Sequence, residues 1–275
     1  MTQYLKITIP CPPDMHDVLI AGLERAHYDS FQELDHALEA YIDKKLFDAA
    51  GLQKILDKYP ALQGFTVEDL PNINWNEEWE KNFDPVYIDD RVQIRAIFHD
   101  PKPGFEFEVI INPKMAFGTG HHETTHLIVA RQLGIDHMGK HVLDVGTGTG
   151  ILAIMAHKLG AAKITATDID DWCISNSEEN FALNGLEKYE LLKGTIDKLT
   201  LSASYDIIYA NINKNVLLDE LPVYTTLLHK KGLLVLSGFY ADDMPDLKQK
   251  AEEHGLSLRH TSSRNNWAMM QLDFA

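Results

Sequence analysis

Short apolar runs alternate with segments of helical length through the second half of the chain, and this alternation constrains the fold more than any other feature. The apolar runs are Val142–Val145, Lys163–Thr167, Tyr189–Leu192, Asp206–Ala210 and Leu233–Ser237. Such runs are typical of parallel strands that are buried on both faces. Helices are predicted over Ile151–Leu159, Trp172–Leu183, Val216–His229 and Asp242–His254, with two final strands at Leu256–Thr261 and Trp267–Phe274. The alternation predicts a doubly wound α/β sheet with helices on both faces.

Residues 1–70 have a different pattern, which predicts a separate small α+β domain. Strands are expected at Tyr4–Pro10, Phe31–Leu34, Ala37–Asp43 and Gly64–Val67, and helices from Pro12 to about Ala26 and from Asp48 to Tyr59. The order strand, helix, strand, strand, helix, strand is that of the ferredoxin-like fold.

Residues 71–90 are interpreted as a linker because they combine two prolines with six acidic residues and a single lysine. Trp75 and Trp79, four residues apart, are expected to pack one helical turn against a domain. Two strands, Arg91–Phe98 and Phe105–Ile111, are expected around the turn-forming residues 100–104. The larger domain is therefore predicted to span residues 91–275.

Charge and cysteine content narrow the classes of partner and compartment. The 275 residues carry a net charge of −16, which argues against a nucleic-acid backbone as the main partner. Cys11 and Cys173 match no disulfide or zinc spacing and suit a reducing cytoplasm. We expect neither a signal peptide nor a membrane-spanning segment, because no apolar run is long enough.

A glycine-rich turn follows the first buried strand and carries the strongest indication of a ligand. Gly146, Gly148 and Gly150 form a G-x-G-x-G pattern between that strand and a helix. Glycines let the backbone approach a ligand, and the helix N-terminus offers free N–H groups. A dinucleotide fingerprint requires a glycine where Ile151 stands, so NAD is disfavoured. Gly146 and Gly148 become candidate cofactor contacts.

Two polar side chains at the ends of later strands complete the candidate site. Asp168 ends the second buried strand, where a carboxylate in a doubly wound sheet reaches a ribose diol. The alternative role for Asp168, capping the next helix, is already available to Asp170 or Asp171. Asn211 follows the fourth strand and is expected to point its amide toward the reacting centre.

A competing motif, His122-Glu-Thr-Thr-His126, matches the H-E-x-x-H signature of zinc hydrolases. Two histidines four residues apart on a helix chelate zinc, with the glutamate as general base. A third ligand is expected on a nearby segment, and an unrelated strand follows instead. We therefore favour a helix that begins near His122, whose side chain caps the helix or covers a ligand, and no metal site. His122 is also the nearest candidate for a general base.

Taken together, three stretches resemble the ribosomal protein L11 methyltransferase family (PrmA), a family of class I S-adenosylmethionine (AdoMet) methyltransferases. They are Phe117-Gly-Thr-Gly-His-His-Glu-Thr-Thr125, Leu143-Asp-Val-Gly-Thr-Gly-Thr-Gly-Ile-Leu152 and Asn211-Ile-Asn213. The Trp-containing segment from Asn74 to Phe83 resembles that family's linker, whereas residues 1–70 resemble it only in layout. The chain departs from the family at His121 and at Lys114-Met115, which leaves the conformation of the loop before Thr125 open.

This resemblance implies a small substrate-recognition domain (1–70), a flexible linker (71–90) and a catalytic domain (91–275). It implies AdoMet as methyl donor and lysine ε-amines and the N-terminal α-amine of a basic, Lys-rich large-subunit ribosomal protein as acceptors, with trimethylated products. It places AdoMet contacts at Thr125, Gly146, Asp168 and Asn211. Alternative functions are methylation of another protein or a small molecule, a zinc hydrolase through His122 and His126, and a non-catalytic AdoMet-sensing or ribosome-binding module.

Methyl transfer is an in-line displacement at an activated carbon, so catalysis is expected to rest on proximity and alignment. The acceptor amine must be neutral, and the candidate groups that orient it are the side-chain oxygen of Asn211 and nearby backbone carbonyls.

Overall fold

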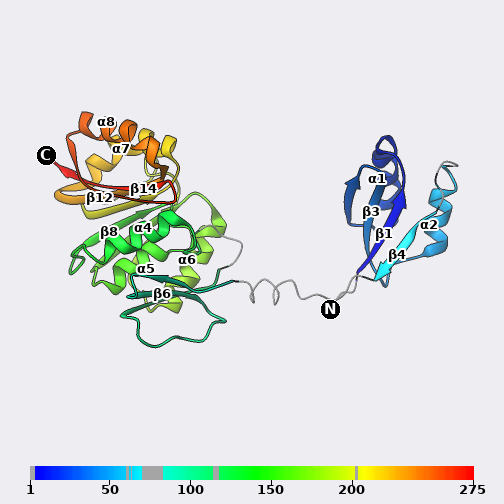
Figure 1. The fold of residues 1–275 in the computed structure, drawn as a ribbon, viewed down its shortest axis with the longest axis horizontal. Coiled ribbons are helices and arrows are strands. Elements are labelled where there is room, and N and C mark those ends of the chain that lie inside the picture. The colour runs from blue at the N-terminus through cyan, green and yellow to red at the C-terminus, as the bar shows by residue number, and fades with distance from the viewer. Residues whose placement is uncertain (1–3, 60–61, 63, 70–82, 114–117, 202–203) are drawn as a thin grey trace. The chain divides into compact units, whose positions relative to one another are not determined.

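The computed structural model describes residues 4–59, 62, 64–69, 83–113, 118–201 and 204–275. The chain divides into two compact units, Met1–Asn82 and Phe83–Ala275 (Figure 1). The predicted packing of Trp75 and Trp79, and most of the predicted linker, lie outside the described residues. Within the described part of the chain, no helix is long and apolar enough to cross a membrane.

The N-terminal unit has the predicted ferredoxin-like order. Its elements are β1 (Tyr4–Pro10), η1 (Pro13–Met15), α1 (His16–Glu24), β2 (Ser30–Leu34), β3 (Ala37–Asp43), α2 (Ala49–Leu56) and β4 (Thr66–Asp69). The strands form one sheet in the order β2-β3-β1-β4. Alternate residues of β1 and β3 are buried against α1 and α2. The fourth strand begins two residues later than predicted, because Gly64 has a φ of 113° and cannot be extended there.

A seven-stranded sheet in the order β10-β9-β8-β11-β12-β14-β13 forms the centre of the C-terminal unit. Its strands are β8 (His141–Val145), β9 (Lys163–Asp168), β10 (Tyr189–Lys193), β11 (Tyr205–Asn211), β12 (Leu228–Tyr240), β13 (Leu256–Arg264) and β14 (Trp267–Phe274). The five neighbouring strands β10, β9, β8, β11 and β12 pair in parallel. β14 pairs antiparallel with both β12 and β13. The predicted doubly wound sheet is confirmed.

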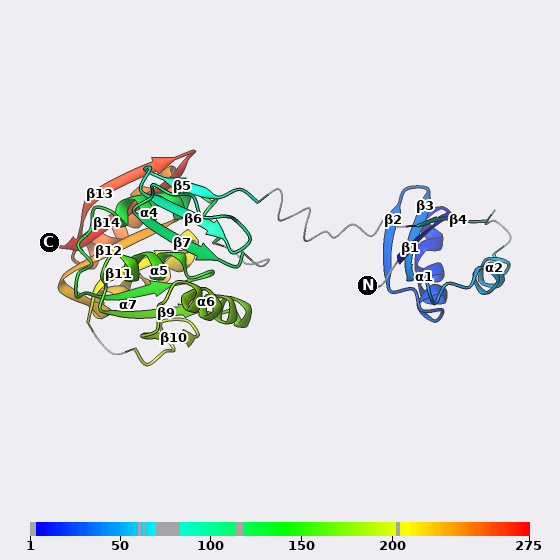
Figure 2. The ribbon, with the colours of Figure 1, turned by 90° about the horizontal axis from the view of Figure 1, so that it is seen from below.

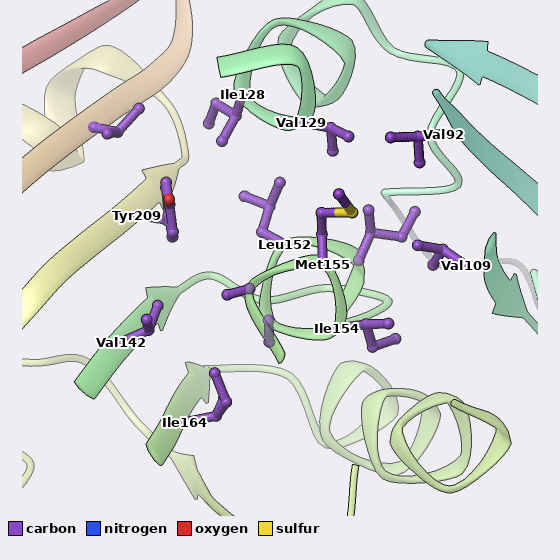
Figure 3. Close-up of a cluster of buried hydrophobic side chains, with 14 of the residues drawn as sticks. Val92, Val109, Ile128, Val129, Val142, Leu152, Ile154, Met155, Ile164 and Tyr209 are labelled. Carbon is purple, nitrogen blue, oxygen red and sulfur yellow. The ribbon is translucent and has the colours of Figure 1, made fainter. Parts of the chain in front are cut away.

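Helices cover both faces of this sheet, which explains why its strands are apolar on both sides. The helices are α4 (Glu123–Gln132), α5 (Ile151–Lys158), α6 (Asp171–Leu183), α7 (Lys214–Leu227), η2 (Ala241–Asp243) and α8 (Met244–Glu253). Ile128 of α4 and Met155 of α5 pack with Val142 and Tyr209 in the core on one face (Figure 3). Leu217 of α7 and Leu247 of α8 belong to the core on the other face.

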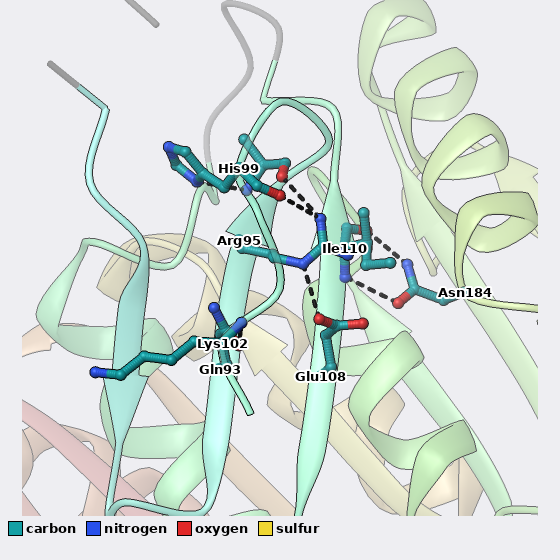
Figure 4. Close-up of polar contacts among 8 residues, drawn as sticks. Gln93, Arg95, His99, Lys102, Glu108, Ile110 and Asn184 are labelled. Carbon is teal, nitrogen blue, oxygen red and sulfur yellow. Dashed lines mark hydrogen bonds and ion pairs between the residues drawn. The ribbon is translucent and has the colours of Figure 1, made fainter. Parts of the chain in front are cut away.

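A second sheet of three strands, β5 (Val86–Ile88), β6 (Val92–Ala96) and β7 (Phe107–Ile111), packs into the core that contains α4 and α5. The two strands predicted here are present, but β6 and β7 pair in parallel, so the connection between them crosses back rather than forming a tight turn. Arg95 of β6 bonds Glu108 of β7 at 2.8 Å and the carbonyl of His99 at 2.9 Å (Figure 4). Asn184 bonds both backbone groups of Ile110, which ties the end of α6 to β7.

Candidate functional site

The glycine-rich turn joins β8 to α5, and its backbone requires glycine. Gly146, Gly148 and Gly150 have φ values of 68°, 56° and 84°, in the left-handed region that side chains rarely adopt. A Cβ on Gly146 would overlap the Ile212 side chain, and a Cβ on Gly150 would lie 2.6 Å from the Phe181 ring. A similar constraint applies to Gly238 of β12, with φ of 95°, where a Cβ would overlap the backbone oxygen of Ile212. The chain is therefore packed closely around this turn.

Side chains of α6 hold the carbonyl groups of the turn from below. Ser177 donates to the Gly148 carbonyl at 2.7 Å, and Asn180 donates to the Thr149 carbonyl at 2.8 Å. Both side chains are fully buried. Neither residue was predicted from the sequence, although a polar stripe at helical spacing could have indicated a buried polar face: Asn176, Ser177, Asn180 and Asn184.

Asp168 lies at the end of β9, as predicted, and its carboxylate reaches the turn. One oxygen accepts from the Gly148 N–H at 3.0 Å and the other from the Asp170 N–H at 3.1 Å. The side chain of Asp170 caps α6 by accepting from the Trp172 N–H at 2.8 Å. Asp168 is therefore not the helix cap, and it lies at the strand end where a ligand would approach the turn. Its contact with a ribose stays a prediction.

Thr125 and Asn211 meet at the carboxyl end of β11. The Asn211 Nδ2 lies 3.4 Å from the Thr125 hydroxyl, while its buried Oδ1 has no hydrogen-bond partner among the described residues. Both residues line one cavity with Gly118, Gly146 and Gly148. Four of the five predicted cofactor residues are thus together, and Asp168 contacts the same turn. The cavity is small, about 20 Å³. At its wall the Thr149 hydroxyl donates to the Gly118 carbonyl, which joins the glycine-rich turn to the segment before α4.

Asp144 is a buried carboxyl that our sequence analysis did not single out. It lies on β8 directly below the turn, where its Oδ2 accepts from the Thr147 hydroxyl at 2.7 Å and the Ala153 N–H at 3.2 Å. Its Oδ1 is buried without a partner among the described residues. Burial raises the pKa of Asp144 to about 7, against the effect of those two hydrogen bonds. The carboxyl braces the turn and lies beneath it.

The residues of the H-E-x-x-H match have structural partners. His122 caps α4, with Nδ1 3.3 Å from the Thr124 N–H and 2.8 Å from the Thr124 hydroxyl. Glu123 accepts from Asn265 at 2.6 Å and from Arg264, and these bonds hold its pKa below the usual range. A carboxylate held in this way is a poor general base. No group of three potential metal ligands occurs within the described ranges.

His126 lines a different and larger cavity, of about 330 Å³, between α4 and β13. Arg131, His260 and Arg264 also face this cavity. Burial and the nearby Arg264 lower the pKa of His126. Apart from His126, none of the predicted site residues lies in this cavity, so the two histidines of the motif face different surroundings.

Comparisons with known proteins agree with this geometry. The family model described as ribosomal protein L11 methyltransferase (PrmA) matches residues 17–274. The chain is 42% identical over 276 residues to the ribosomal protein L11 methyltransferase of Phocaeicola vulgatus, covering 98% of each chain. It is 46% identical over 260 residues to that of Porphyromonas gingivalis, covering 93% of this chain and 90% of the relative.

A solved structure of similar fold is the ribosomal protein L11 methylase of Lactobacillus delbrueckii subsp. bulgaricus. The TM-score is 0.66 at 31% sequence identity, and the match covers 70% of this chain and 99% of the solved chain.

Proposed function

Because this chain belongs to the ribosomal protein L11 methyltransferase (PrmA) family of AdoMet-dependent methyltransferases, we propose that it methylates ribosomal protein L11. The observation that carries the proposal is the family match over residues 17–274, joined with the meeting of Thr125, Asn211 and the glycine-rich turn at the carboxyl ends of β8 and β11. Ligands of open α/β sheets bind at such carboxyl ends.

The residues around the turn fit AdoMet as the methyl donor. Gly146 and Gly148 line the cavity, where the absence of side chains exposes their backbone to a ligand, and the carboxylate of Asp168 on the Gly148 N–H would accept from the ribose hydroxyls. The Oδ1 of Asn211, which has no hydrogen-bond partner in the described part of the chain, offers a buried acceptor in the same cavity. When bound, AdoMet supplies a methyl carbon activated by its sulfonium, so the amine lone pair forms the N–C bond while the S–C electrons stay on sulfur.

The acceptor amine is oriented by this chain rather than deprotonated by it. Asn211 Oδ1 would accept one N–H of the amine and so direct the nitrogen lone pair. Thr125 would hold Asn211 in place through the 3.4 Å contact with Nδ2. Glu123 is held by Arg264 and Asn265, and His122 caps α4, so neither serves as a base. Catalysis then depends on proximity and alignment.

The acceptors we propose are lysine ε-amines and the N-terminal α-amine of L11, carried to the trimethyl stage. Residues 1–70 carry a net charge of −6, and residues 71–90 a further −5, which favours a basic, Lys-rich protein over RNA. We assign substrate recognition to residues 1–70 and expect no direct binding of nucleic acid or membrane. Both cysteines are free, as a reducing cytoplasm requires, and we propose that compartment.

The direct test incubates the purified full-length protein with AdoMet and purified L11 and follows the substrate by mass spectrometry. Each methyl group added to a lysine or to the N-terminus should raise the mass of L11 by about 14 Da, the mass of one CH₂ unit. If L11 stays unmodified while AdoMet binds normally, L11 is not the substrate. The alternative function, methylation of another protein or of a small molecule, would then be favoured.

Calorimetry of AdoMet binding tests the cofactor residues. Asp168→Ala removes a charged acceptor, worth about 1.5–3 kcal/mol, so the affinity should fall roughly ten- to hundredfold. Asp170→Ala is the matched control, because it removes an aspartate two residues away that caps α6 and is not among the residues that line the cavity. Equal AdoMet affinity in the two variants would show that Asp168 does not hold the cofactor.

A further inference from the structure

Three aromatic rings from distant parts of the sequence meet beside the proposed methyl-transfer site. The ring centroids of His122 and Trp267 are 4.5 Å apart, and those of Tyr240 and Trp267 are 4.2 Å apart. We refer to His122, Tyr240 and Trp267 as the edge aromatic cluster. We propose that this cluster is the subsite that receives the alkyl stem and the partly methylated nitrogen of the substrate amine, an inference that rests on the proposed function.

Strand register places the cluster at the carboxyl edge of the sheet. Asn211 pairs with Ser237 of β12, and three residues later Tyr240 ends β12 opposite Trp267, the first residue of β14. His122 caps α4, the helix that carries Thr125, and α4 lies beside β14 in both ribbon views (Figures 1 and 2). The register thus places Tyr240 and Trp267 at the same edge of the sheet as Asn211, and His122 lies at the start of the helix that carries Thr125.

Polar contacts hold the cluster in place before any substrate arrives. The turn between β13 and β14 contains Asn265 and Asn266, both left-handed, with φ values of 45° and 67°. Asn265 donates to Glu123, the residue after His122, at 2.6 Å, and the Ala241 N–H donates to the Asn266 carbonyl at 2.8 Å. The turn thus fastens Trp267 to the start of α4 on one side and to the end of β12 on the other. A preorganised surface of this kind loses little entropy on binding.

The chemistry of repeated methylation suits an aromatic surface. As the N–C bond forms, positive charge develops on nitrogen, and the face of a tryptophan or tyrosine attracts that charge. Each transfer leaves a cationic ammonium, which loses a proton to solvent before the next transfer. Each added methyl group therefore replaces an N–H and adds apolar surface, so an acceptor such as Asn211 Oδ1 holds mono- and dimethylated amines less well than the unmodified amine. Aromatic faces contact the methyl groups of the neutral amines and attract the cationic products. Tyr240 is 47% exposed and so is accessible to an incoming side chain.

The first experiment measures the products formed on L11 by full-length variants. With Tyr240→Leu or Trp267→Leu, we expect mono- and dimethylated amines to accumulate in place of the trimethylated form. Trp267→Phe, which keeps an aromatic face, should restore most of the trimethylated product. Tyr87→Leu is the matched control, because Tyr87 is 40% exposed and its ring stacks on Phe105, just before β7, rather than on a ring of the edge aromatic cluster. A wild-type distribution of products in both leucine variants would overturn the proposal.

The second experiment measures binding without turnover, so it stays informative if a variant is inactive. The probe is the capped amino acid Nα-acetyl-trimethyllysine methylamide, titrated by NMR in the presence of S-adenosylhomocysteine. Its affinity should fall roughly two- to thirtyfold in Tyr240→Leu, the range expected for loss of one cation–π contact. A neutral analogue with a tert-butyl group should bind the wild type more weakly and be less affected by the variant. Equal affinities of the probe for wild type and variant would contradict the subsite.

The two proposals fail in different ways. If the wild-type protein leaves L11 unmodified, the proposed function is wrong. If the wild type trimethylates L11 and the leucine variants do so equally well, only the aromatic subsite is wrong.

Discussion

The two units of this chain bury polar groups very differently. Among the described residues of the N-terminal unit, His16 is the only fully buried polar or charged side chain. In the C-terminal unit, buried polar residues gather around the glycine-rich turn, among them Thr125, Asp144, Asp168 and Asn180. Buried polar groups cost free energy unless they are hydrogen-bonded, so their concentration marks where the fold maintains a site.

Charged side chains in the N-terminal unit instead pair with one another at the surface. Lys6 and Glu39 are half-buried and 3.4 Å apart, and Lys6 also contacts the exposed Glu68 at 2.9 Å. Lys44 and Asp69, both exposed, are 2.6 Å apart, and an exposed pair of this kind contributes little to stability. We propose that the acidic residues in excess over these pairs attract a basic partner at a distance, since residues 1–70 carry a net charge of −6. The buried polar groups of the C-terminal unit instead shape a cavity, and the contrast accompanies the proposed division between recognition and chemistry.

The largest effect is expected from removing the N-terminal unit. Deletion of residues 1–70 should leave AdoMet affinity nearly unchanged and abolish efficient methylation of L11, because the substrate loses its docking surface. Without such a tethering contact the effective concentration of an amine at the site falls by roughly 10²-fold or more. Calorimetry and mass spectrometry on the same preparation measure both quantities.

A salt titration is the accompanying control. Methylation by the full-length protein should weaken as ionic strength rises, since exposed charges are screened within about 8–10 Å at physiological salt. If the truncated protein methylates L11 at the full-length rate, or if the full-length rate does not change with salt, the N-terminal unit does not select the substrate.

The next largest effect concerns Asp144. Its pKa is raised to about 7 in the folded protein, against about 3.9 when unfolded, so the folded state binds the extra proton between these values. The contribution of Asp144 to the free energy of unfolding is therefore greatest below about pH 4, and it declines as the pH rises toward 7. Asp144→Asn should remove that decline, with a difference on the order of 4 kcal/mol across the window.

Urea unfolding of wild type and Asp144→Asn between pH 4 and 8 measures this difference directly. Asp136→Asn serves as the control, because Asp136 is exposed and its side chain only accepts from the Met138 N–H. Parallel stability curves for wild type and Asp144→Asn would show that folding does not raise the pKa of Asp144.

A smaller loss is expected for Asn180→Ala, which removes the support below the turn. The change leaves the Thr149 carbonyl and the Asn112 N–H without their partner, at roughly 1–3 kcal/mol for each buried group. The free energy of unfolding measures the loss. A value near zero would mean that the turn keeps its conformation without α6.

The smallest effect is expected for Lys44→Ala in the N-terminal unit. Lys44 and Asp69 are 43% and 57% exposed, so their ion pair should contribute about 0–1 kcal/mol to stability. The same unfolding measurement applies. A loss as large as that of Asn180→Ala would contradict the contrast between the two units.

The features that could be predicted from the sequence are those whose signals lie within a short stretch of residues. The glycine-rich turn, Asp168 and Asn211 were identifiable because a buried strand, its terminal polar residue and the next helix lie within a few residues of one another. The ferredoxin-like order was also predictable, since alternation in β1 and β3 reports one buried face directly.

What escaped prediction depends on contacts between distant segments. The parallel pairing of β6 with β7 is decided by packing against α4 and α5, while residues 100–104 read as an ordinary turn. The meeting of His122 with Trp267 likewise requires the β12–β14 register, which no local pattern contains. Asp144 looked like one residue of an apolar strand, because its role follows from complete burial.

Ile212 packs against both Gly146 and Gly238, and this position determines which substitutions at the two glycines a second change can compensate. At Gly146 an added methyl group would meet the side chain of Ile212, so a lineage that first shortened residue 212 could later accept alanine there with only the strain of a positive φ. At Gly238 the same methyl group would meet the backbone oxygen of Ile212, which every amino acid carries. Gly146 is thus open to a compensating change elsewhere in the chain, and a suppressor screen started from Gly146→Ala should return changes at Ile212. The same screen started from Gly238→Ala should return only the original glycine.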